Sequence, residues 1–223
     1  TEIGRFFEFL RAEGLLSSAR IIITSDHGEE FSDHGSFYHF ATPYQEVLHV
    51  PLIFRGQGIA AGRRVEAPVS LVDIAPTILA WAGVSAPSEM DGLDLTPLLG
   101  QARTETAAKA LQKRLNTRLQ HGEATGNSQW ESKIPGQVPV FTSILKGPFK
   151  LVHRSLDEEV ALYDLSTDPK ENTDIAAQNP EITQTLRSAM ASRKAEFAER
   201  TVENNRIDLD PAEVERLRAL GYL

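Results

Sequence analysis

An acidic residue, a histidine and a glycine follow directly on an apolar run near the start of the chain. The three β-branched isoleucines at 21–23 predict a strand that is covered on both faces, as in a parallel sheet. Asp26 and His27 then lie outside the carboxyl end of that strand, where open α/β sheets bind their ligands, and Gly28 can release the chain from strand geometry. A carboxylate beside an imidazole suits a divalent metal. The alternative interpretation is a strand end followed by a solvated polar turn.

Histidines are concentrated after this strand. Three of the six in the chain, His27, His34 and His39, fall within thirteen residues, and His49 precedes the next apolar segment. The loop at 28–45 is rich in glycine, serine and histidine, and its length indicates a functional role. Imidazole groups in such a loop can bind a metal or transfer protons.

This run resembles the sulfatases of the alkaline phosphatase superfamily. The family pattern is a strand followed by T-S-D-H/N-G-E, E/D-H-G, a Lys or His, Y-x-E and x-V-P-L-I. The chain fills these positions with residues 24–29, 33–35, His39, 44–46 and 49–53. Family-like segments follow at 72–79, 91–99, 149–152, 162–165, 168–172 and 217–223. The resemblance therefore covers nearly the whole chain.

The resemblance implies roles for three residues. Asp26 is the expected metal ligand, and His27, at a position that holds Asn or His, is expected to bind the metal or the substrate's transferred oxygens. Calcium is the first choice of metal, with Mn²⁺, Mg²⁺ or Zn²⁺ left open. His39 stands where the family places a cationic Lys or His facing the sulfate, so it is the expected catalytic and substrate-binding residue. The alternative for His39 is a solvent-exposed loop histidine.

Other polar residues have simpler interpretations. A structural hydrogen bond suits His34 at least as well as a functional role, and His49 is expected in packing or at the surface. Asp73 is expected to cap a helix. Lys150 and Tyr163 occupy predicted strand positions and are expected to make contacts in the core or within the subdomain.

The family's nucleophile has no counterpart in these residues. Sulfatases carry a Cys or Ser in a C/S-x-P-x-R motif, with the Cys oxidised to formylglycine, whereas this chain has no cysteine and no Ser-x-Pro-x-Arg run. The resemblance thus implies the C-terminal portion of a sulfatase, with formylglycine and half of the metal site in a missing N-terminal half. We expect hydrolysis of sulfate esters by the complete enzyme and no activity from this fragment alone. The alternatives are a phosphatase or phosphodiesterase of the same superfamily, and a non-catalytic remnant that acts only in packing or association.

The elements that must position these residues follow from periodicity. Apolar spacing predicts helices over 3–13, 73–82, 104–120, 180–200 and 211–220, and strands over 20–25, 49–54, 138–145, 149–154 and 160–165. The fold class is α/β: the end of a large mixed sheet flanked by helices, plus a smaller C-terminal antiparallel α+β subdomain. The expected units are 1–100, part of the α/β catalytic domain, 101–137, a helical insertion and linker, and 138–223, the small subdomain.

Composition limits the partners. The chain of 223 residues has a formal net charge of −8, which argues against nucleic acid. A small anionic sulfate ester, such as a sulfated glycan or an aryl sulfate, remains compatible because a metal can reverse the local field. No apolar run reaches the roughly 20 residues that span a membrane. Membrane association and oligomeric state stay open, and a periplasmic or secreted location is implied by the resemblance only.

Overall fold

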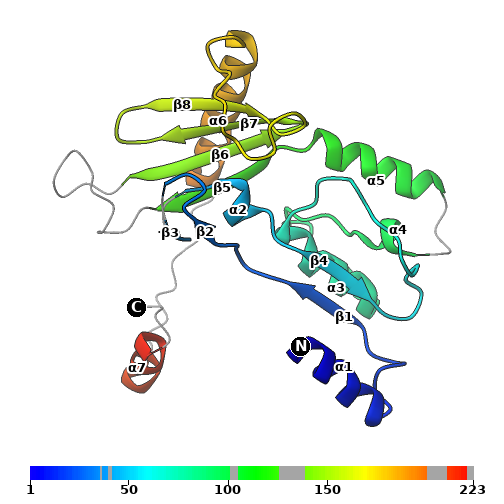
Figure 1. Ribbon diagram of the computed structural model, residues 1–223. Coiled ribbons are helices and arrows are strands. Elements are labelled where there is room, and N and C mark those ends of the chain that lie inside the picture. Colours follow the sequence, from blue (N-terminus) through cyan, green and yellow to red (C-terminus); the bar gives the residue numbers. More distant parts are fainter. Residues whose placement is uncertain (36, 40–41, 101–104, 126–138, 200–209, 220–223) are drawn as a thin grey trace.

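The computed structural model describes all residues except 36, 40–41, 101–104, 126–138, 200–209 and 220–223 (Figure 1). The described residues form a small antiparallel pair of strands with flanking helices, followed by a four-stranded antiparallel sheet. The predicted fold class, α/β with an antiparallel α+β subdomain, is confirmed. The boundaries at 100 and 137 remain predictions. None of the helices in the described residues is both long and apolar enough to cross a membrane.

The N-terminal elements position the strand that precedes Asp26. Helix α1 (Glu2–Ala12) is capped by Thr1, whose side chain accepts a hydrogen bond from the Gly4 backbone N–H. Strand β1 (Ile21–Thr24) pairs antiparallel with β4 (Leu52–Arg55) and is half-buried along its three isoleucines. The expected parallel, fully covered strand is therefore wrong for the described residues. The apolar run lines an open cleft of about 1060 Å³ instead of packing under a second layer.

The segment between β1 and β4 contains the short hairpin β2 (Glu30–Phe31) and β3 (Phe37–Tyr38), and the one-turn helix α2 (Gln45–Leu48). We call residues 26–49 the histidine loop. Gly28 donates its N–H to the Val47 carbonyl oxygen at 2.7 Å. A Cβ at Gly28 would collide with the Glu46 carbonyl oxygen, so glycine is needed for this close approach. The base of the loop is thereby closed.

Asp73 stands at the predicted cap position, but its carboxylate caps the short 3₁₀ helix before it and holds several segments together. Helix α3 (Ile74–Ala82) follows the short 3₁₀ helix η1 (Leu71–Asp73) and ends at Gly83. The Asp73 carboxylate makes no bond to the first turn of α3. It accepts from the backbone N–H groups of Ser70 and Leu93. It also accepts from the two terminal guanidinium nitrogens of Arg118, at 2.6 and 2.7 Å. A fully buried carboxylate requires such partners.

The predicted helix at 104–120 is α5 (Glu105–Thr117). Its apolar stripe buries Leu111 and Leu115 against Leu98 of α4 (Thr96–Leu99) and against Leu95. Leu119, predicted on the same stripe, lies beyond the helix end and packs in the core of the C-terminal sheet. Burial of this stripe stabilises the α3–α5 region through the hydrophobic effect.

The C-terminal sheet has the order β5-β6-β7-β8, all antiparallel. Its strands are β5 (Gln120–Thr125), β6 (Val140–Lys146), β7 (Phe149–Arg154) and β8 (Glu159–Asp164). The predicted three-strand meander is confirmed, whereas β5 arises within residues predicted as helix end and linker. The helices α6 (Pro180–Glu199) and α7 (Pro211–Ala219) follow as predicted.

The two faces of this sheet pack against different segments of the chain. One face packs Ile144, Leu151 and Leu162 against Leu186 and Met190 of α6. The other face presents Phe141, Val152 and Tyr163, which pack with Tyr44 of the histidine loop. In Figure 1 the segment that carries β2, β3 and α2 accordingly lies against the sheet, on the side opposite α6. The histidine loop thus packs against the C-terminal sheet.

Candidate active site

Asp26 and His27, the predicted metal ligands, lie side by side at the start of the loop. The His27 Nδ1 lies 2.8 Å from the Gly28 carbonyl oxygen. Because a carbonyl oxygen can only accept, Nδ1 is the donor in this contact, which leaves Nε2 as the ring nitrogen that could bind a metal. That Nε2 lies 3.7 Å from Asp26 Oδ2, close enough for one cation to contact both atoms. The hydrogen bond from the His27 backbone N–H lowers the pKa of Asp26, which favours its ionised form.

These two residues fit part of a divalent-metal site. The Asp26 side chain is 79% exposed, so a cation can reach it. A carboxylate oxygen suits hard cations, and a histidine whose other nitrogen donates to a carbonyl has the tautomer of a metal ligand. Calcium takes about six to eight oxygens, so this pair supplies only a fraction of a calcium coordination shell.

His39 lies directly on His27. The two imidazole rings stack with their centroids 4.0 Å apart and their planes at 22°. The His39 Nδ1 lies 3.4 Å from Glu29 Oε2, a carboxylate that sequence reasoning did not single out. The structure therefore brings Asp26, His27 and His39 together in one place. Their roles as ligands and acid remain predictions.

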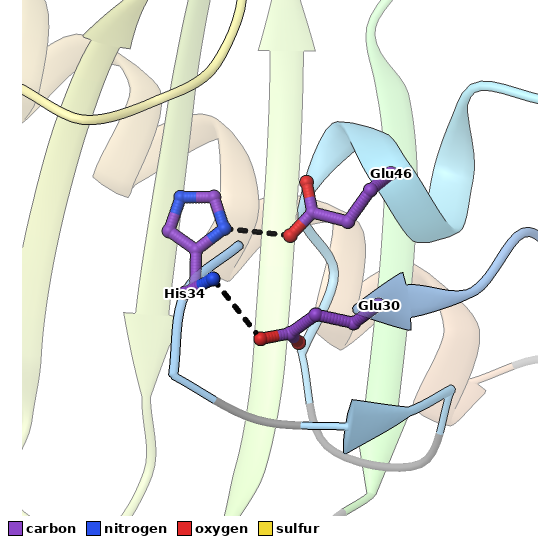
Figure 2. Close-up of side chains that lie close together, drawn as sticks. All are labelled: Glu30, His34 and Glu46. Atoms are coloured by element: carbon purple, nitrogen blue, oxygen red, sulfur yellow. Dashed lines mark hydrogen bonds and ion pairs between the residues drawn. The ribbon is translucent and has the colours of Figure 1, made fainter. Parts of the chain in front are cut away.

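A second cluster gathers Glu30, His34 and Glu46, whose side chains point toward one another (Figure 2). His34 Nδ1 lies 2.6 Å from Glu46 Oε1, and the His34 backbone N–H donates to Glu30 Oε1 at 3.1 Å. Thr42 donates its hydroxyl to the other oxygen of Glu30 at 3.0 Å. By residue type, one imidazole and two carboxylates could also hold a metal ion.

The hydrogen bonds of His34 argue against a metal there. Its Nδ1 faces a carboxylate and its Nε2 faces the Glu171 carbonyl oxygen at 3.2 Å. Both partners are acceptors, so both nitrogens must donate and His34 is an imidazolium without a free lone pair. Burial lowers the pKa of His34, but the hydrogen bonds to Glu46 and Glu171 outweigh it and raise the pKa overall. The cluster is a partly buried ion pair, which confirms the structural hydrogen bond expected of His34.

This charge state gives a pH-dependent contribution to stability. Because the pKa of His34 is raised in the folded state, its ion pair stabilises the fold fully at pH values below the ordinary imidazole pKa of about 6.5. This stabilisation is lost as the pH rises through the pKa that His34 has in the folded protein. We expect the unfolding free energy of the parent to exceed that of His34→Gln most at pH 6, with the difference shrinking by pH 9. Urea unfolding at pH steps measures it. His153→Gln, at the less buried His153–Glu158 pair, is the control, and a difference that grows with pH would contradict the imidazolium assignment.

His49 takes no part in either cluster. It is exposed and lines a separate polar cleft of about 460 Å³, together with Asp33, Gln45, Glu46 and residues 169, 170 and 172. The surface position expected of His49 is confirmed.

Three comparisons relate the chain to known proteins. The family model described as Sulfatase matches residues 1–84. Arylsulfatase K from Xenopus laevis is 31% identical over 194 residues, an alignment that covers 85% of this chain and 34% of that protein. The chain thus spans about a third of the length of the curated relatives it matches.

Solved structures give the same picture. A protein in complex with its substrate D-glucosamine-2-N,6-O-disulfate has a TM-score of 0.66 and 28% identity, over 91% of this chain and 39% of that one. The phosphonate monoester hydrolase from Silicibacter pomeroyi has a TM-score of 0.64 and 24% identity, over 91% of this chain and 39% of that one. The second likeness shows the fold alone.

Proposed function

The chain belongs to the sulfatase family, of which it matches a C-terminal portion, and we propose that the complete natural polypeptide hydrolyses sulfate esters at a divalent-metal site to which Asp26 and His27 contribute. The observation that carries the proposal is the meeting of three groups. Asp26 Oδ2 and His27 Nε2 lie 3.7 Å apart, and the His39 ring stacks on His27.

Each group has a task that its chemistry permits. Asp26 and His27 would hold the cation, which supplies positive charge for the sulfate oxygens. His39, oriented by Glu29, would hold a proton near the leaving oxygen or neutralise charge that develops on the sulfate. The nucleophile lies outside this set, since the chain contains no cysteine to become formylglycine.

The substrate class is a small sulfate ester, and a sulfated sugar is our first choice. The support is the structural neighbour solved with D-glucosamine-2-N,6-O-disulfate, which shares 28% identity with this chain. Specificity is a property of loops that vary freely on one fold, so the identity of the sugar does not follow from the fold. Calcium is the proposed metal because a carboxylate is a hard oxygen donor.

Phosphoryl or phosphonyl transfer is the second candidate. The fold is shared with a phosphonate monoester hydrolase at 24% identity. Both reactions move a tetrahedral anionic group, so the same cation and His39 would serve either. Sulfatase family membership decides our order of preference.

The test is a comparison of three esters. The complete natural polypeptide is assayed with an aryl sulfate, an aryl phosphate and an aryl phosphonate, with calcium and then with manganese. We expect the sulfate to give the highest kcat/KM and chelation to remove the activity. A phosphate or phosphonate preferred over the sulfate would favour the second candidate, and no turnover of any ester would favour a non-catalytic protein.

Residues 1–223 by themselves should not turn over any of these esters. Asp26 and His27 are too few ligands to bind calcium tightly, and residues 1–223 hold neither a cysteine to become formylglycine nor a Ser-x-Pro-x-Arg run. Ile53 on β4 and Phe6 on α1 are more than half exposed, and exposed apolar strand surface promotes aggregation. We expect low solubility and no turnover of purified 1–223 in the same assays. Metal-dependent turnover that is lost in Asp26→Ala would contradict this expectation and require another nucleophile.

A further inference from the structure

Glu171 is a buried acid in an unusual backbone conformation. Its φ of 54° lies in the left-handed region, which non-glycine residues seldom adopt. Only 1% of the residue is exposed to solvent. A strained and desolvated carboxylate persists only where surrounding contacts determine its position.

Lys150 supplies the charge that Glu171 needs. Its Nζ lies 2.7 Å from Glu171 Oε1, and both side chains are at most 1% exposed. Neither of these two atoms has a further hydrogen-bond partner among the described residues, so each charge depends on the other. Burial lowers the pKa of Lys150 and raises that of Glu171, while their mutual attraction opposes both shifts. Such a pair adds little stability over an apolar pair of the same shape.

Two further contacts of Glu171 reach the histidine loop. Its second carboxylate oxygen, Oε2, accepts the backbone N–H of Gln45 at 2.6 Å. Its backbone carbonyl accepts from the His34 imidazolium at 3.2 Å. His34 and Gln45 stand on either side of His39 in the sequence. One residue of the C-terminal subdomain therefore fastens the loop both before and after His39.

We propose that Glu171, held by Lys150, is a positioning residue that fixes the histidine loop on both sides of His39 and so sets the rate of the chemical step. The proposal rests on the proposed function, because His39 acts only if the complete polypeptide hydrolyses an ester. Lys150 stands on β7 beside Tyr163, on the face of the sheet that carries the loop. The Lys150–Glu171 pair thus joins this face of the sheet to the loop, beside the packing of Tyr44.

The test is Glu171→Asp in the complete natural polypeptide. Aspartate keeps the charge but is one methylene shorter, so it cannot reach Lys150 and Gln45 together from the same backbone. We expect kcat to fall about 10- to 100-fold, the cost of a displacement of about 1 Å at a catalytic group. KM should stay within about twofold, and bound metal should be unchanged.

Glu158→Asp is the matched control. Glu158 also has a left-handed φ, 56°, but it lies exposed in the turn between β7 and β8 and pairs with His153. The kcat of the Glu158→Asp variant should equal that of the parent. Equal kcat in Glu171→Asp and the parent, or loss of metal from Glu171→Asp, would overturn the proposal.

Hydrogen exchange gives a readout that does not need activity. Backbone amides of the histidine loop should exchange faster in Glu171→Asp than in Glu158→Asp, and equal exchange would overturn the proposal. A parent that hydrolyses no ester would contradict the proposed function, and the exchange comparison would then decide alone whether Glu171 fixes the loop. If Glu171→Asp does not fold, Lys150→Met/Glu171→Leu replaces it. This variant buries no charge and has no oxygen for the Gln45 N–H. It is expected to show the same losses, and it overturns the proposal if kcat and exchange match the parent.

Discussion

Replacing Asp26 with alanine should abolish both the bound divalent cation and ester hydrolysis in the complete polypeptide. The carboxylate supplies a negative charge and an oxygen ligand, and it lies 3.7 Å from the other proposed ligand atom, His27 Nε2. A lone imidazole holds a hard cation poorly, since such cations prefer oxygen donors. Elemental analysis after dialysis, together with the aryl sulfate assay, measures both losses on one sample.

Asp33→Ala is the control for this experiment. Asp33 is an exposed carboxylate of the same loop, but it accepts from the Phe31 backbone N–H instead of facing His27. It should keep metal content and most of the activity, which separates loss of a ligand from general disturbance of the loop. Full metal occupancy in Asp26→Ala would remove Asp26 from the metal site.

Local sequence signals predicted the elements well. The 3.6-residue spacing of Leu111 and Leu115 located α5, and alternation with turn residues located the strands at 140–164. The cluster of histidines after β1 also led to the correct place, since His27 and His39 stack in the structure. These features arise from residues near one another in the chain, where pattern and spacing carry the information.

Local sequence patterns did not predict the contacts between residues that lie far apart in the chain. The Glu171 carbonyl meets His34 across 137 residues, and Asp73 meets Arg118 across 45. A charged residue on a strand or loop does not reveal its partner, because burial and pairing are set by how the layers pack. For Glu171 the sequence offered only the family-like motif at 168–172. That motif indicated the segment but not what Glu171 contacts.

The predictions of strand direction and of the number of strands were wrong for related reasons. A continuous apolar run suggests burial on both faces, but β1 pairs antiparallel with β4 and borders an open cleft. Strand β5 begins with Gln120, His121 and Gly122, whose types do not favour a strand. Its pairing with β6 supplies the backbone hydrogen bonds that local propensity does not. Tertiary context decides such cases.

His39→Ala should lower turnover by about 10²- to 10⁴-fold, the range expected on removing a general acid, while metal content stays unchanged. The metal should remain because His27 does not depend on the stacked ring for its orientation. Its Nδ1 is held by the Gly28 carbonyl at 2.8 Å, within its own turn of chain. The loss should therefore appear in kcat and not in metal binding.

Two further variants decide what His39 contributes. His39→Lys should recover part of the loss, since the family pattern allows either cation at this position and positive charge facing the sulfate is one of the two proposed contributions. His49→Ala, which removes an exposed histidine of the same loop, should behave as the parent. If His39→Ala turned over within a factor of two of the parent, His39 would be a loop residue with no part in the reaction. If His39→Lys were as slow as His39→Ala, charge alone would not suffice, and proton transfer from the imidazole would be the contribution that remains.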